Sequence, residues 1–149
     1  MVFFQFDILL GRIYILCIEE YNIVLWGKMM SKHIEWITHK DKEILSVDFS
    51  ELYDKEFVEK IIELRNFTIK SGKENINELL NISSSYVYGE VLKESQKTAK
   101  IVNDQIEKIA VVGVTIVQKS FFGFFSNIMH AKIRTFDSIE NAKNWLVKS

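Results

Sequence analysis

The feature that most constrains the fold of this chain is a regular alternation of strand-like and helix-like patterns after Met30. Residues 33–39 and 43–49 both alternate apolar and polar side chains, which is typical of half-buried strands. The short HKDK segment between these two runs predicts a hairpin. Further along the chain, residues 109–114 form a continuous apolar run, which is typical of a central strand covered on both faces.

Helix patterns fill the intervals between the strands. Asp54 is the expected cap of a helix that runs to about residue 71, and Gly72 fits the position just past its end. A weaker strand pattern covers residues 75–82, and a second helix is expected over about residues 89–103. The later elements are a third helix in the phenylalanine-rich stretch, a strand at 133–136, and a last helix opened by a capping box of Asp137 and Glu140.

This order of elements predicts an α/β fold. Strands that alternate with helices imply a largely parallel sheet with right-handed crossovers. We therefore expect a single domain with a mixed, largely parallel sheet of four or five strands, a leading hairpin and about four helices.

Charge and cysteine content exclude several classes of protein. The 19 basic and 20 acidic side chains give a net charge of −1 and are well mixed, so we expect no nucleic-acid partner. The single cysteine, Cys17, cannot form an intramolecular disulfide and suits a reducing cytoplasm. We therefore expect a cytoplasmic protein.

Residues 1–29 are more apolar than the rest of the chain. Asp7, Arg12, Glu19 and Glu20 interrupt every window long enough to span a membrane, so no integral span is expected. A hairpin of residues 13–18 and 23–26 is physically feasible. The alternative is that translation starts at Met30, because residues 26–28 are encoded by a purine-rich run that resembles a ribosome-binding site. On that hypothesis the segment 1–29 is translated upstream sequence, and the domain is residues 30–149.

Four stretches of the chain resemble the SpoIIAA-like family of bacterial and archaeal proteins. They are IEWITHKDKEILSVDFSEL, SYVYGEVLKESQKTAK, IEKIAVVGVT and RTFDSIENAKNWL, and the resemblance covers Ile34 to Val147. This family consists of small STAS-type domains that have also been likened to CRAL-TRIO lipid-transfer folds. The resemblance implies a STAS-like domain with a non-enzymatic regulatory or protein-interaction role. The D-S-[ST]-G motif of anti-sigma-factor antagonists, whose serine is phosphorylated, is absent.

Metal and catalytic sites find little support in the sequence. His33 and His39 share one strand face, but six residues of strand place them about 20 Å apart, so they cannot hold one metal ion. The chain has no nucleophile elbow and no phosphate-binding loop. Asp48 and Ser50 end a strand and are expected to hold the following loop in place. We expect no enzyme activity, no metal and no cofactor.

The loop at residues 81–90 contains the first candidate site. Loops at the carboxyl ends of strands form the ligand crevice in open α/β sheets. Ser83, Ser84 and Ser85 are candidate phosphorylation sites, because the resemblance to STAS domains places the phosphorylated serine in this loop. A phosphate there would also be stabilised by the start of the next helix. The alternative is that these serines cap the helix and fill turn positions.

The segment KSFFGFFSNIMHAK, residues 119–132, contains the second candidate site. Its apolar side chains cover one side of a helix over an arc of about 160°. We expect Phe121, Phe125 and Ile128 to be almost fully buried, and Phe122 and Phe124 to be partly exposed or to line a pocket. Gly123 in the middle of the helix would permit a close approach or a kink. The candidate ligand-binding residues are Phe121, Phe122, Phe124, Phe125 and Met129.

Two kinds of partner follow from these candidate sites. The first is a protein bound by a regulatory interaction domain. The second is a small apolar ligand such as a fatty acid or lipid, which a carrier would hold in a cavity of about 300 Å³ or more under the phenylalanine helix. A homodimer is a further arrangement compatible with the sequence.

Overall fold

The computed structural model of the protein describes residues 34–149, which form one five-stranded sheet with four α-helices. The strand order is β1-β2-β3-β4-β5; β1 is antiparallel to β2, and the remaining neighbours are parallel. The strands are β1 Ile34–His39, β2 Lys42–Asp48, β3 Ile76–Asn81, β4 Ile106–Val112 and β5 Lys132–Phe136. The expected α/β fold, with its leading hairpin and largely parallel sheet, is confirmed.

Several expectations fall on residues 1–33, which lie outside the described residues. They concern the hairpin at residues 13–26, the start at Met30, Cys17 and the face of the strand occupied by His33.

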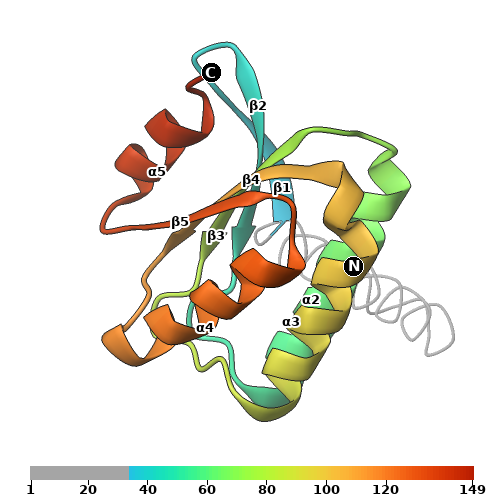
Figure 1. The fold of residues 1–149 in the computed structure, drawn as a ribbon, viewed down its shortest axis with the longest axis vertical. Helices are drawn as coiled ribbons and strands as arrows, with labels where there is room; N and C mark the ends of the chain where they lie inside the picture. The colour runs from blue at the N-terminus through green and yellow to red at the C-terminus, as the bar shows by residue number, and fades with distance from the viewer. Residues whose placement is uncertain (1–33) are drawn as a thin grey trace, which may run out of the picture. The chain divides into compact units, whose positions relative to one another are not determined.

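The helices cover the two faces of the sheet unequally. They are α2 Asp54–Ser71, α3 Gly89–Val102, α4 Ile116–Ile128 and α5 Ile139–Leu146, with the short 3-10 helix η2 Asn103–Gln105 after α3. Figure 1 shows α2, α3 and α4 on one side of the sheet and α5 on the other. The larger apolar core lies under the first three helices, and a smaller core of Ile44, Leu79, Ala110, Val112, Ala142 and Leu146 lies under α5.

Local sequence chemistry explains the turns and helix ends. Lys40 and Asp41 connect β1 to β2 with φ values of 49° and 62°, the conformation that two-residue hairpins require. Gly72 ends α2 in the left-handed conformation and donates its N–H to the Ile69 carbonyl, as expected.

Two of the expected helix caps are wrong. Asp54 is the first residue of α2, and Tyr53 is the N-cap, with no capping bond from its side chain. The side chain of Ser138, rather than that of Asp137, caps α5 by accepting the Asn141 N–H. A full capping box does occur, but it joins Thr115 and Gln118 at the start of α4.

Strand β4 begins three residues earlier than the apolar run at 109–114 predicts. Exposed Glu107 interrupts the apolar pattern at the start of the strand. The strand ends at Val112 because Gly113 turns the chain with a φ of 83°. This turn brings Gly113 against Ser83 in the neighbouring loop, where only a residue without a Cβ atom fits.

Candidate functional site

A hydrogen-bond network fixes the loops at the carboxyl ends of β2 and β3. Asp48 Oδ1 accepts the Ser50 N–H at 2.9 Å and the Asn81 side-chain amide at 3.1 Å. Asn81 Oδ1 accepts both the N–H and the hydroxyl of Ser83, at 3.1 and 2.7 Å. The expected role of Asp48 is confirmed, and the network joins two loops that lie more than 30 residues apart in the chain.

The three candidate serines lie in different environments. Ser84 is exposed, whereas Ser83 donates to Asn81. Ser85 is buried, and its hydroxyl donates to the Ile82 carbonyl at 2.6 Å. None of them caps α3, because the N-cap is Tyr88. Ser84 is therefore the accessible member of the candidate regulatory loop, and its φ of 57° puts its backbone in the left-handed region.

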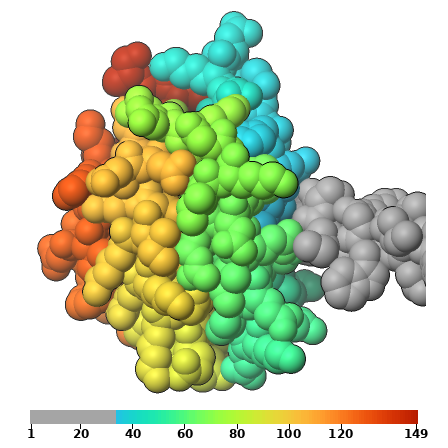
Figure 2. Space-filling view, turned by 90° about the vertical axis from the view of Figure 1, so that its right-hand side faces the viewer, coloured from blue at the N-terminus to red at the C-terminus, as the bar shows by residue number. Residues whose placement is uncertain are grey.

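Three exposed tyrosines gather beside this loop, and we call Tyr53, Tyr86 and Tyr88 the tyrosine cluster. Their exposed fractions are 44%, 59% and 55%. The ring centroids of Tyr53 and Tyr86 are 5.6 Å apart, and those of Tyr86 and Tyr88 are 6.2 Å apart. The Tyr88 hydroxyl donates to Asp54 Oδ1 at 3.2 Å, which raises the pKa of Tyr88. In Figure 2 the N-terminal ends of α2 and α3, where the cluster lies, meet at the lower end of the molecule.

Helix α4 carries two neighbouring apolar stripes. The inner stripe is Phe122 and Phe125, continued by Met129 just past the helix end, and it faces the core; the buried polar residue Gln118 lies in line with it. The outer flank is Val117, Phe121, Phe124 and Ile128. Ile128, at the edge of the outer flank, also packs against this core. Phe125 is buried and Phe124 is 51% exposed, as expected. Phe121 and Ile128 are only half-buried, so the expectation that both are almost fully buried is wrong. An added Cβ at Gly123 would meet nothing within 4 Å, so no close approach explains that glycine.

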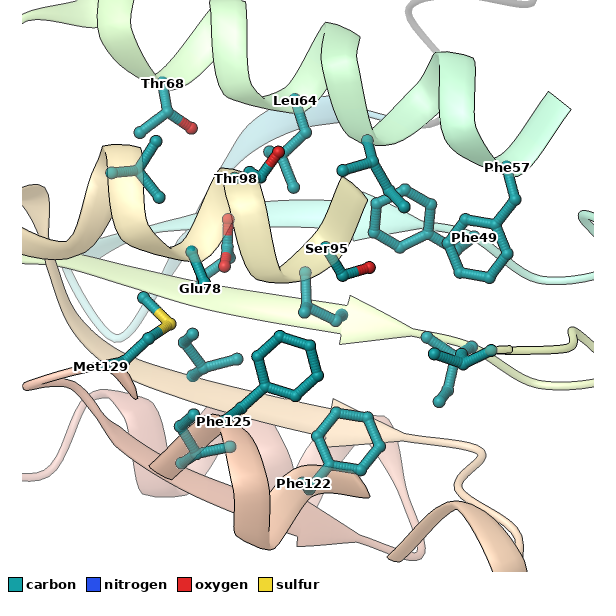
Figure 3. Close-up of a pocket in the computed structure, with 18 residues that line it drawn as sticks. Phe49, Phe57, Leu64, Thr68, Glu78, Ser95, Thr98, Phe122, Phe125 and Met129 are labelled. Atoms are coloured by element: carbon teal, nitrogen blue, oxygen red, sulfur yellow. The ribbon is translucent and has the colours of Figure 1, made fainter. Parts of the chain in front are cut away.

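A cavity of about 110 Å³ lies between the sheet and helices α2, α3 and α4. Figure 3 shows Phe122, Phe125 and Met129 lining it from one side, opposite residues of α2 and α3. Phe121 and Phe124 do not line it, so the structure brings together three of the five candidate ligand-binding residues. The cavity is also smaller than the 300 Å³ expected for a lipid carrier.

Glu78 projects from the middle of β3 into this cavity, and its exposed fraction is 5%. Its strand neighbours are Leu45 on β2 and Ile109 on β4. Burial raises the pKa of Glu78 from 4.5 to about 7. Within residues 34–149, no hydrogen bond or ion pair reaches this carboxyl group.

Neither Glu78 nor the tyrosine cluster was identified from the sequence. Glu78 lies in the strand with the weakest pattern, and a charged residue there suggests a solvent-facing position. The tyrosines belong to two loops, so their proximity depends on the parallel pairing of β2 with β3. One signal was visible beforehand, since three tyrosines lie within or next to predicted loops at strand ends.

Metal and membrane sites are not indicated in the described part of the chain. Among residues 34–149, no cluster of three or more His, Cys, Asp or Glu side chains is arranged to hold a metal ion. His39 lies 3.0 Å from Asn144 Oδ1, and His130 lies 3.7 Å from an Asp104 carboxyl oxygen. Within the same residues, none of the helices has the length and apolar character needed to cross a bilayer.

Comparisons with known proteins agree with this architecture. The family model described as SpoIIAA-like matches residues 29–147. A similar solved structure is an uncharacterized protein of the DUF3478 family with a SpoIIAA-like fold from Shewanella loihica PV-4. The two chains are 14% identical with a TM-score of 0.59, and the match covers 76% of this chain and 91% of that chain. At this identity the likeness shows the fold alone. No curated protein matches the chain.

Proposed function

The chain belongs to the SpoIIAA-like family, and from this premise we propose that it is a non-enzymatic regulatory domain that binds a protein partner through the tyrosine cluster. At the family level, the SpoIIAA-like fold supports a regulatory or interaction role. The proposal adds the surface used and the class of partner.

The observation that supports this proposal is the contact between three exposed aromatic rings from two separate loops. Tyrosine is enriched in protein interfaces, because its ring contributes a large apolar area and its hydroxyl group still forms hydrogen bonds. An exposed group of such rings is a feature of binding surfaces rather than of solvated ones. The network of Asp48, Asn81 and Ser83 holds the two loops in place, so little ordering is required on binding.

Ser84 supplies a site for regulation on the same surface. It is exposed, and it lies two residues before Tyr86 in the β3–α3 loop. A phosphate group at Ser84 would place about two negative charges beside the cluster and would disrupt an apolar interface. Ser85 cannot play this role without unfolding the loop, because its hydroxyl group is buried and bonded to the Ile82 carbonyl.

The alternative function, a carrier of a fatty acid, receives less support. The cavity of about 110 Å³ is too small for a long acyl chain. In addition, the Glu78 carboxyl group faces the cavity, and in its ionised form it would repel the carboxylate of a fatty acid.

The test is affinity capture of the full chain from cells of its source organism, followed by quantitative mass spectrometry. The wild type is compared with Tyr86→Ala and with Ile101→Ala. Ile101 is the matched control, because it is a large apolar residue of similar exposure, 50%, near the end of α3 and away from the tyrosine cluster. We expect a partner that the wild type and Ile101→Ala retain and that Tyr86→Ala loses.

Reconstitution with the purified partner makes this result quantitative. Titration calorimetry should show at least about tenfold weaker binding for Tyr86→Ala, which is typical of a residue at an interface hot spot. Ser84→Glu should weaken binding while leaving the thermal midpoint unchanged, and Ser84→Ala should bind like the wild type. Equal binding by Tyr86→Ala and Ile101→Ala would show that the tyrosine cluster is not the docking surface. Size-exclusion chromatography with light scattering tests whether the partner is a second copy.

A further inference from the structure

A buried carboxyl group without a described partner is the most unusual feature of the cavity. A charged side chain is almost never fully buried unless it is paired. Glu78 nevertheless lies in a central strand beneath α2 and α3, and its carboxyl group points toward Thr98 (Figure 3). Arg65 on α2 pairs with Glu94 on α3 and reaches the Thr98 hydroxyl oxygen at 3.4 Å, and no described contact joins it to Glu78. Fold stability alone does not require a carboxyl group here, since an apolar residue would fill the same space with a smaller loss of free energy from desolvation.

A second polar group in the same wall also lacks a partner. Thr68 on α2 lines the cavity and is 1% exposed, and its hydroxyl oxygen has no hydrogen-bond partner within residues 34–149. Buried hydroxyl groups are normally hydrogen-bonded, because an unpaired one costs free energy. Thr98 and Ser95 on α3 line the same space. The wall therefore combines one carboxyl group and several hydroxyl groups with an otherwise apolar lining.

We propose that this cavity binds a small primary amine with a short apolar body, whose ammonium group pairs with the Glu78 carboxylate. An ammonium group donates three hydrogen bonds, so the neighbouring hydroxyl groups on the wall can accept those that Glu78 does not. The apolar body would contact the aromatic and aliphatic side chains from the sheet and α4, including Phe122 and Phe125.

The size of the cavity limits the ligand. An engineered cavity of about 150 Å³ in another protein holds benzene, which has six carbon atoms. A cavity of about 110 Å³ therefore fits an amine with about five or six non-hydrogen atoms. The charge of the wall adds a second limit. A cation compensates the Glu78 carboxylate, a neutral alcohol does so only in part, and an anion is repelled.

This proposal goes beyond the tyrosine cluster and is independent of it.

Three probes of similar size and different charge test it on the full chain: isoamylamine, isoamyl alcohol and isovalerate. Their binding is measured from the amide shifts of Ile109 and Phe125 in nitrogen-15 NMR titrations. We expect saturable binding of isoamylamine, with at least about tenfold weaker affinity for the alcohol and no detectable binding of isovalerate.

Variants identify the group responsible. Glu78→Gln keeps the size of the side chain and removes its charge, so it should bind isoamylamine at least about tenfold more weakly. Glu107→Gln is the control, because Glu107 is an exposed glutamate on the adjacent strand β4. Tyr86→Ala should bind the amine like the wild type, which separates this site from the docking surface.

Three results would overturn the proposal. They are the absence of saturable amine binding, equal affinity for the amine and the alcohol, and equal amine affinity in the Glu78→Gln and Glu107→Gln variants.

Discussion

Two glycines of this chain occupy opposite environments. Gly113 has a φ of 83°, and a Cβ added there would lie 2.2 Å from Ser83 Oγ and 2.5 Å from Ser83 N. Gly123 lies within α4, where an added Cβ meets nothing within 4 Å. The first glycine is required by geometry, whereas the second only weakens a helix.

We therefore expect Gly113→Ala and Gly123→Ala to change stability in opposite directions. Gly113→Ala should lower the free energy of unfolding by at least about 2 kcal/mol, because the left-handed backbone alone costs about 1–2 kcal/mol and the clash with Ser83 adds to it. Gly123→Ala should raise the free energy of unfolding by about 1 kcal/mol. Urea unfolding measures both, and a stable Gly113→Ala protein would mean that the two loops are not held together.

Helix α4 shows how one apolar arc divides between core and surface. Phe125 belongs to the inner stripe and is 8% exposed, whereas Phe124 belongs to the outer flank. The two rings are neighbours in the sequence with centroids 6.5 Å apart, so they form a matched pair.

Truncating these two rings should have unequal effects on stability. Phe125→Ala should lower the free energy of unfolding by about 3–5 kcal/mol, because the deleted ring leaves a cavity beneath the helix. Phe124→Ala should lower it by less than about 1 kcal/mol, since about half of the surface of Phe124 is already in solvent. Chemical unfolding of both variants is the measurement, and a similar loss in each would show that α4 buries both stripes.

Within residues 34–149, the sequence patterns predicted the five strands and four α-helices in their observed order, but neither the 3-10 helix η2 nor the rotation of α4. An apolar arc of about 160° is wider than the stripe that a helix buries against a sheet. The positions of the side chains around the helix therefore do not determine which part of the arc is buried. Gln118 marks the buried side of α4: it is buried, and its side-chain amide donates to the Ser85 carbonyl at 3.0 Å. That contact joins residues 33 positions apart, and no local pattern records it.

The candidate site was less predictable than the fold for the same reason. The cavity residues Phe122, Phe125 and Met129 belong to a helix that the sequence singled out. Glu78 was missed because a charged residue in a strand is normally solvent-facing, and its burial depends on α2 and α3 covering the sheet. The type of each helix or strand follows from the spacing of apolar residues within it. The chemistry of the site depends on how separate helices and strands pack together.

At the scale of the whole molecule, Glu78 makes stability depend on pH. Burial raises the pKa of Glu78 from 4.5 to about 7 in the folded state. Below pH 4.5 the Glu78 carboxyl group is protonated in both the folded and the unfolded state, so its burial does not lower the free energy of unfolding through ionisation. Between pH 4.5 and about 7 only the unfolded chain loses the proton, so the free energy of unfolding falls as pH rises. Above about pH 7 the carboxyl group is ionised in both states, and its ionisation in the buried position lowers the free energy of unfolding by about 3 kcal/mol.

Glu78→Gln should therefore be more stable than the wild type at pH 8, by up to about 3 kcal/mol, and equally stable at pH 4. Among residues 34–149, no other charged side chain lines the cavity. Arg65 on α2 pairs with Glu94 on α3 and lies 3.4 Å from the Thr98 hydroxyl oxygen, and α4 and β5 contribute only uncharged residues. Thermal unfolding across pH 4–8 gives the comparison, with Glu107→Gln as the control. Parallel pH curves for wild type and Glu78→Gln would mean that Glu78 is solvated in the folded protein.

The strand order β1-β2-β3-β4-β5 has a consequence for how the chain reaches this structure. Each of β2 to β5 pairs with the strand before it in the sequence, so each pairing closes a single hairpin or a single crossover. The entropy lost on closing a loop grows with its length, so this order limits the cost of each strand pairing to that of one connection. During synthesis each of β2 to β5 therefore emerges from the ribosome after the strand it pairs with has been made, and the sheet can form in the order in which it is translated.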